Sequence, residues 1–257
     1  MGRARAWPYA GRLTLLESIL VLLAGVAAGT INTVVGSGTL ITFPTLLAVG
    51  FSPVTANVSN TIGLVPGSVA GAIGYRRELA GQKERLKRLA PMSLLGGIVG
   101  AVLLLVLPGE YFEAIVPAFI AIALILIVLQ PRLSAWLEHR RRAAGRATAP
   151  ATFVAGIYGG YFGAAQGILL LAVFGLTLED ELQRTNALKN VLAAIVNGVA
   201  GVVFVFSGSV AWLPVALIAA GATVGGVIGA SVGRRLPPAV LRAFIVVVGV
   251  VAIVRLV

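Results

Sequence analysis

Long apolar runs dominate this sequence and constrain its fold more than any other feature. Several reach the roughly 20 residues that a helix needs to cross a bilayer, and they are continuously apolar, whereas the strands of a membrane barrel alternate polar and apolar residues. Only 11% of the 257 residues are charged, against roughly 25% in soluble domains. The sequence therefore predicts an all-α polytopic protein that crosses the cytoplasmic membrane of the cell several times.

Turn signals divide the apolar runs into spanning helices and two shorter pieces. The short pieces, residues 36–49 and 167–177, cannot cross alone, so we expect re-entrant half helices there. A basic cytoplasmic linker separates two membrane parts, which gives the predicted organisation 1–130, 131–149 and 150–257. The predicted spanning helices cover residues 13–33, 53–75, 86–107, 111–130, 150–165, 182–206, 211–233 and 238–256.

The two membrane parts share short motifs in the same order. SVAG at Ser68 recurs as GVAG at Gly198, an offset of 198 − 68 = 130, and GGIVGA at Gly96 recurs as GGVIGA at Gly225 at nearly the same offset. This spacing indicates a duplicated unit of about half the chain. Internal duplication is typical of secondary transporters, which bind substrate near the midplane where the repeats meet. The alternative is a duplicated scaffold without transport activity.

Basic residues gather in the segments 3–12, 76–88 and 132–146. Short loops rich in Lys and Arg mark the cytoplasmic side, which explains the net charge of +11 without binding to nucleic acid. With four spans per repeat, both termini and these segments share one side, and the acidic stretches PGEYFE and LEDEL lie on the other. If the short pieces also cross, each repeat has five passes and the halves are inverted. We favour the first arrangement and leave the second open.

The stretch TINTVVGSGTLITFP, residues 30–44, places polar residues where lipid is expected. Unpaired backbone groups in lipid cost several kcal/mol each, so a helix breaks at that depth only where protein or a water-filled cavity satisfies them. A half helix that begins near Gly36 would direct free N–H groups and the positive end of its dipole inward, where they attract an anion. The alternative is that the glycines only permit close helix packing. The candidate residues of this break are Asn32, Gly36, Ser37 and Gly38.

A matching stretch in the second half, GIYGGYFGAAQGILLL, keeps one amide and one glycine at the corresponding place. Gly156 and Gly160 match Gly25 and Gly29, and this alignment places Gln166 at the second break. Because the glycine content is lower here, we expect the second break to be less open than the first. Gln166 is its candidate residue.

Each break is followed by a polar stretch, TANVSNT in the first half and TNALKNVLAAIVN in the second. Their asparagines recur at helical spacing, so each set lies on one face of a helix. Uncharged amides can donate N–H groups to an oxyanion without the cost of burying a cation. The candidate residues are Asn57, Asn60, Asn186 and Asn190.

Lys189 is a lone cation about two turns into the second polar helix. An ionisable residue within a membrane span costs at least about 2.5 kcal/mol at the centre and is a candidate functional residue. The alternative is that Lys189 lies shallow, where it snorkels to the interface or pairs with Glu179 or Glu181.

The order of these motifs, from the glycine-rich break through SPVTANVSNTIGLVPGSVAGAIGYRREL to TNALKN, resembles the TauE/SafE sulfite exporter family of membrane permeases. The resemblance runs from about Leu13 to Val257. It implies transport of a sulfur oxyanion, such as sulfite, or a small organosulfonate across the cytoplasmic membrane, with ion coupling for which the proton is a candidate. It implies site residues at Asn32, Gly36, Ser37 and Gly38, at Asn57, Ser59 and Asn60, and at Asn186, Lys189 and Asn190.

We therefore expect a secondary transporter that exports a small anion through a site between the repeats, with that anion and the lipid bilayer as its partners. A passive anion channel would use the same residues and is the alternative. A membrane-embedded enzyme is disfavoured, because the sequence has no cysteine and no histidine or carboxylate pair within an apolar run, and no cofactor or metal is expected. Stripes of glycine at every fourth residue, within 63–71 and 221–233, allow close packing within a subunit or in a homodimer.

Overall fold

The computed structural model describes residues 13–139, 147–178, 180–231, 243, 245–248 and 250. Within these residues the chain is helical and contains no strand. The expected helix over 238–256 and the basic segment 3–12 fall wholly or largely outside the described residues. The helices are α1 (Leu15–Val34), α2 (Thr39–Ala48), α3 (Pro53–Gly74), α4 (Lys83–Val106), α5 (Gly109–His139), α6 (Thr148–Tyr161), α7 (Gln166–Thr177), α8 (Leu182–Val205) and α9 (Trp212–Ser231).

Five of the described helices are long and apolar enough to cross a membrane: α1, α4, α5, α8 and α9. α3 has 22 residues, but its asparagine, serine and threonine residues make it less apolar than these five. α6 has only 14 residues and ends at Tyr161, earlier than the sequence predicts. The prediction of a polytopic helical membrane protein is confirmed, whereas four full spans in each half are found only in part.

Glycines bring the backbones of α1 and α9 into contact. A β-carbon added at Gly25 would lie 3.0 Å from the carbonyl oxygen of Ile218, and one at Gly29 would lie 2.3 Å from that of Ala222. These contacts advance in the same direction along both helices, so α1 and α9 are parallel. The glycine stripe of α9 is therefore used within the chain.

α4 and α6 pack in the same way. A β-carbon at Gly96 would lie 2.3 Å from the carbonyl oxygen of Phe153, and one at Gly100 would lie 2.0 Å from that of Ile157. α4 and α6 are therefore also parallel, and no larger residue than glycine fits at these crossings without moving a helix.

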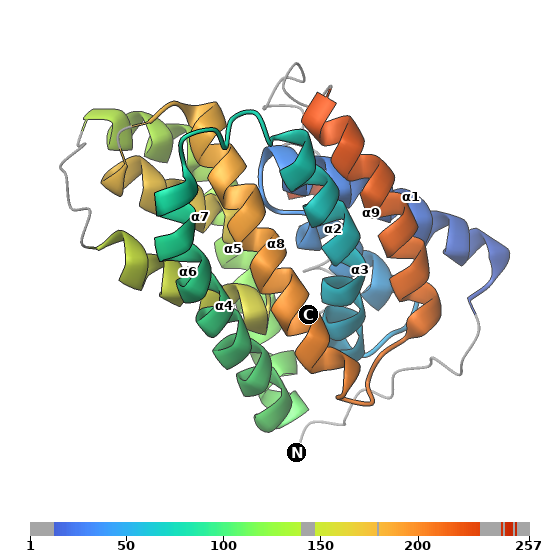
Figure 1. Ribbon diagram of the computed structural model, residues 1–257. Coiled ribbons are helices and arrows are strands. Elements are labelled where there is room, and N and C mark those ends of the chain that lie inside the picture. The colour runs from blue at the N-terminus through green and yellow to red at the C-terminus, as the bar shows by residue number, and fades with distance from the viewer. Residues whose placement is uncertain are drawn as a thin grey trace.

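α3 and α8 cross each other in the opposite sense. Asn197 donates to Ser68 over 3.0 Å, whereas Gly201, one turn further along α8, lies against Ile62, nearer the start of α3. These helices are thus antiparallel. Figure 1 shows α8 running between α4 and α3, with α9 on the far side of α3.

The helix directions divide the bundle into two sets. Gly63 packs against Ile218, and Gly74 against Ala230, so α3 runs parallel to α9 and hence to α1. α4 runs in the same direction as α8. Leu89 near the start of α4 lies in one hydrophobic cluster with Leu188 of α8, and Gly97, further along α4, packs near Val196, further along α8. α1, α3 and α9 therefore point one way, and α4, α6 and α8 the other.

The short helices α2 and α7 reverse the chain. Since α1 and α3 are parallel, α2 between them returns the chain to the end of the bundle at which α1 began. Gly38 lies where a β-carbon would be 2.5 Å from the carbonyl oxygen of Ala28, so the chain folds back on α1 directly after the break. α7 does the same between α6 and α8, which are also parallel.

This reversal corrects the predicted membrane sidedness. The sequence placed the acidic stretch LEDEL opposite the basic segment 76–88, but Arg85 forms an ion pair with Asp180. Figure 1 shows the α3–α4 and α7–α8 connections at the same end of the bundle and the α8–α9 connection at the other. The prediction is wrong because it counted no passage for α2 and α7. Among the described residues, this end of the bundle is rich in Arg and Lys, which marks it as cytoplasmic.

The fold predicts different outcomes for two substitutions of helical glycines. Gly29→Ala places a methyl group 2.3 Å from the carbonyl oxygen of Ala222, whereas Gly198→Ala meets nothing within 4 Å. We expect Gly29→Ala to destabilise the protein by about 1–3 kcal/mol through overpacking, with Gly198→Ala close to wild type. Thermal melting of the purified proteins in detergent measures the difference. Equal melting temperatures for the two variants would contradict the α1–α9 contact.

Candidate functional site

The first helix break separates α1 from α2. α1 ends at Val34, and the chain turns through Gly36, whose φ of 88° is costly for any residue with a side chain. No side chain caps the start of α2 at Gly38. The predicted half helix is thus present, and no described side chain caps its first N–H groups.

The second break separates α6 from α7. α6 ends at Tyr161, the chain turns through Gly163 with φ 76° and Ala165 with φ 60°, and α7 begins at Gln166. The sequence predicted the start of α7 to within one residue, but it placed the end of α6 at residue 165, about one helical turn too late. Because the glycines recur about every helical turn, the two halves can be aligned in two registers that differ by one turn. The sequence alone could not choose between these alignments.

Aromatic rings hold the chain where it leaves α6. The ring of Phe162 lies 5.2 Å from that of Phe43 in α2 and 5.9 and 5.7 Å from those of Phe112 and Phe119 in α5. Pairs of this kind contribute about 0.5–1.5 kcal/mol beyond their buried area. The second break is therefore anchored to helices of the first half.

The two breaks touch each other in the interior. The backbone N–H of Gly167 donates to the carbonyl oxygen of Gly36 over 3.0 Å, and a β-carbon on Gly36 would lie 2.5 Å from the α-carbon of Gly167. The N–H groups of Gln166 and Ile168 also have backbone partners. The first N–H groups of α7 thus have backbone partners.

Side chains from α8 converge on the end of α1. The Nζ of Lys189 donates to the carbonyl oxygens of Asn32 and Thr33 over 3.0 and 3.2 Å. The amides of Asn186 and Asn190 each donate to Thr33 over 3.2 Å. The last carbonyls of a helix lack partners within it and carry its negative end, so an ammonium and two amides are a well-matched cap.

Lys189 does not snorkel, because its side chain is fully buried. None of the ion pairs among the described residues involves it. Glu181 is exposed, and Glu179 lies outside the described residues. Lys189 therefore stands within the protein with neutral oxygen partners, where its charge is poorly screened.

Asn57 caps the end of α6 in the same way. Its Nδ2 donates to the carbonyl oxygen of Tyr161 over 2.9 Å, and its side chain is fully buried. Each polar helix thus caps the broken helix of the other half, since α3 caps α6 and α8 caps α1.

Three other predicted residues have different partners. Asn60 binds the first turn of α2, where Thr42 donates to its Oδ1 and its Nδ2 donates to Thr39 over 3.3 Å. Ser59 accepts from the backbone N–H of Ala211 over 2.9 Å, at the start of α9 and away from the breaks. The side chain of Asn32 donates to the Oγ of Ser68 over 3.3 Å, beside Asn197.

Four buried polar atoms at the breaks lack a hydrogen-bond partner among the described residues. Leaving such an atom unpaired costs about 1–3 kcal/mol, so each is expected to meet a ligand or water. Their clustering where two helices break marks this region as the candidate site. The atoms are Ser37 Oγ, Asn57 Oδ1, Gln166 Nε2 and Asn186 Oδ1.

Sequence reasoning missed several participants. Thr39 and Thr42 lie three residues apart on one face of α2, a spacing that could have indicated them. Thr33 and Tyr161 act through their backbone carbonyls, and no side-chain pattern signals that role.

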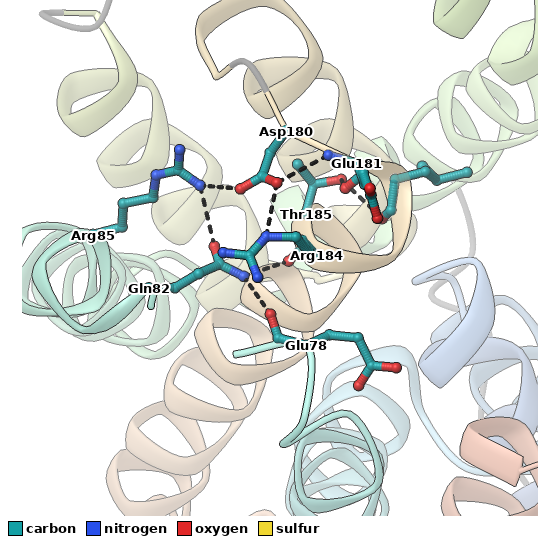
Figure 2. A network of polar contacts seen from close by, with 8 residues as sticks. Glu78, Gln82, Arg85, Asp180, Glu181, Arg184 and Thr185 are labelled. Atoms are coloured by element: carbon teal, nitrogen blue, oxygen red, sulfur yellow. Dashed lines mark hydrogen bonds and ion pairs between the residues drawn. The ribbon is translucent and has the colours of Figure 1, made fainter. Parts of the chain in front are cut away.

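A second polar network lies at the cytoplasmic end, at the first turn of α8 (Figure 2). Asp180 pairs with Arg85 of α4 and, over 2.8 Å, with Arg184 of α8. Gln82, almost fully buried, donates to the backbone carbonyls of Glu78 and Arg184 over 2.9 Å each. The network ties the α3–α4 connection to the helix that carries Lys189.

Asp180 titrates abnormally in this network. Burial raises the pKa of its carboxyl, but hydrogen bonds from Arg85 and the Glu181 backbone, with the charges of Arg184 and Arg85, outweigh it and hold the pKa below the ordinary value. A lowered pKa in the folded state means that the ionised form stabilises the fold. That stabilisation is complete above the ordinary pKa and is lost as the pH falls through the lowered one.

The breaks and the helix directions define a class: a polytopic helical membrane protein in which two interrupted helices cross in the interior. The chain belongs to the sulfite exporter TauE/SafE family, whose model matches residues 21–256. This confirms the resemblance found in the sequence. The protein is a multi-pass membrane transporter and not an enzyme.

Three curated relatives are similar over nearly their whole length. The probable membrane transporter protein ORF9 of Sinorhizobium sp is 28% identical over 238 residues, which cover 92% of this chain and 90% of the relative. The probable membrane transporter protein YfcA of Escherichia coli (strain K12) is 28% identical over 247 residues, covering 94% and 90%. A probable membrane transporter protein of Haemophilus influenzae is 22% identical over 231 residues, covering 89% of each chain. No solved structure matches the chain.

The Asp180 network predicts a pH-dependent stability. Asp180→Asn should lower the melting temperature at neutral pH, and the difference from wild type should vanish well below pH 3.8, the ordinary Asp value. Glu84→Gln, which removes an exposed i,i+3 pair with Lys87, is the matched control and should change little. Melting curves across pH measure both. A difference that persists at the lowest pH would contradict the assignment.

Proposed function

We propose that the protein is a secondary transporter that exports a small anion, sulfite or a small organosulfonate, with ion coupling. The family description supports the substrate class. The observation that carries the proposal is the fully buried Lys189, whose partners are the neutral carbonyl oxygens of Asn32 and Thr33. A buried charge without an opposite charge is costly, and a bound anion neutralises it.

Hydrogen-bond donors lie beside this charge. An ammonium has three N–H donors, of which Lys189 directs two to α1. Gln166 Nε2 and Ser37 Oγ are buried and have no partner among the described residues. Gly167 links these groups, because it touches Gly36 and lies against the stem of Lys189. A sulfur oxyanion has several acceptor oxygens and suits such a set of donors.

We further propose that residues 1–130 and 150–257 form inverted repeats, joined by the basic linker 131–149, with the short helix as a fifth pass in each. Three observations support this. α1 packs on α9 as α6 packs on α4, α3 and α8 run in opposite directions, and each half holds a broken helix. Transporters with inverted repeats bind substrate where discontinuous helices meet, and one repeat moves against the other to alternate access.

Transport by purified protein tests this function. In proteoliposomes with an imposed ion gradient, of protons in one set and of Na⁺ in another, wild type should accumulate labelled sulfite against its gradient, which a passive channel cannot do. Gln166→Met should reduce the flux at least about tenfold, because it removes a donor to a charged ligand worth about 1.5–3 kcal/mol. Lys189→Met should abolish it, and Lys87→Met, which removes an exposed lysine, should leave it unchanged.

Gln166→Met separates a binding defect from a folding defect. Its Nε2 has no partner among the described residues, so the substitution breaks no described hydrogen bond of that atom. Each variant is checked by size-exclusion chromatography and melting temperature before reconstitution. Sulfite flux that is absent in wild type, or equal in a folded Gln166→Met variant, would overturn the proposal.

A further inference from the structure

The two helix breaks are capped by the same device. Asn57 donates to Tyr161 at the end of α6, and Asn186 donates to Thr33 at the end of α1, over 2.9 and 3.2 Å. In both asparagines the Oδ1 is buried and has no partner among the described residues. Each break thus combines the negative end of a helix with an amide oxygen that lacks a donor.

The two breaks differ in the charge of the side chains that cap the preceding helix. At the end of α1, the ammonium of Lys189 lies 3.0 and 3.2 Å from two carbonyl oxygens. At the end of α6, the described side-chain partner of Tyr161 is the neutral amide of Asn57. Among the described residues, a cation therefore compensates the negative end of α1 and not that of α6.

No described residue of α3 substitutes for the missing ammonium. An offset of 129 or 130 residues matches Lys189 to Asn60 or Ser59 in α3. Asn60 is engaged with the first turn of α2, and Ser59 with the start of α9. Both are neutral, so neither supplies a positive charge to the end of α6.

We propose that a monovalent cation, Na⁺, binds at the end of α6, where it takes the role that Lys189 plays at the end of α1. The Oδ1 of Asn57 and the carbonyl oxygens of the last turn of α6 are its ligands. Neutral oxygens and helix C-terminal ends are the groups with which discontinuous transporter helices hold Na⁺. No cluster of His, Cys, Asp or Glu that could hold a multivalent metal occurs among the described residues.

The site gives the transporter a coupling ion. Its role in coupling rests on the proposed function, but the binding itself does not. An anion beside Lys189 and a cation beside Asn57 would occupy neighbouring breaks that touch at Gly36 and Gly167. Occupation of one site then favours occupation of the other by direct attraction across a poorly screened interior.

Melting of the full-length protein in detergent, without sulfite, tests the site. The chloride salts of Na⁺, K⁺ and choline are compared at equal ionic strength. Na⁺ should raise the melting temperature of wild type by several degrees relative to choline, because a ligand that binds only the folded state stabilises it. Asn57→Ala should lose this shift, and Asn186→Ala, at the break that already has an ammonium, should keep it.

Two further variants keep the test decisive. Asn57→Asp retains an oxygen ligand and should keep or increase the Na⁺ shift even if Asn57→Ala does not fold. Lys189→Met removes the built-in cation and should gain additional Na⁺ dependence. A K⁺ shift that is lost with Asn57 supports a less selective monovalent site. Equal melting temperatures in all three salts, or a shift that survives in folded Asn57→Ala, would overturn the proposal.

The outcomes separate this inference from the proposed function. A Na⁺ shift that depends on Asn57 in a protein that does not move sulfite would contradict the function alone. Sulfite transport by a protein with no Na⁺ shift would contradict the cation site alone.

Discussion

The structure depends on satisfying the backbone groups of two helices that break inside the helix bundle. A carbonyl or N–H group without a partner in lipid costs several kcal/mol, so a break persists there only when other parts of the chain supply partners. Here the partners come from the opposite half. Lys189, Asn186 and Asn190 cap α1, and Asn57 caps α6.

This exchange of caps explains why the polar residues are where they are. Asparagine and lysine are costly within a span, but they cost less when their N–H groups meet carbonyls that would otherwise be unpaired. The same contacts join the halves at their most polar point. A ligand that competes for Lys189 would therefore loosen the hold of α8 on α1, which offers a route from anion binding to movement of the halves.

Much of the fold follows from the sequence, because the length of an apolar run fixes a membrane helix. α3 and α8 begin and end within a residue of the predicted bounds, and the half helices α2 and α7 were expected because they are too short to cross alone. Their direction could not be predicted in this way. It depends on which helices pack together, as α1 and α9 do at Gly29 and Ala222. A stripe of glycines marks a packing face, but it does not identify the partner helix or its direction.

The candidate site was predicted in outline. Lys189, Asn186, Asn190, Gly36 and Gln166 do lie around the crossing of the breaks. Ser59 does not. One face of α3 contacts several neighbouring helices, and the side chain of Ser59 lies against the start of α9. The partners of the polar side chains are mostly backbone carbonyls, whose positions depend on where a helix ends. The sequence gives those ends only to within about a turn.

The central claim is that the two short helices each reverse the chain, so that the breaks cross in the interior. Labelling with a membrane-impermeant maleimide tests it directly, because the chain has no cysteine. Cysteine is introduced singly at the exposed residues Arg77, Glu181 and Glu110. The account predicts that the cysteines at 77 and 181 react from the same, cytoplasmic side and that the one at 110 reacts from the other. Reaction of the cysteines at 77 and 181 from opposite sides would contradict it.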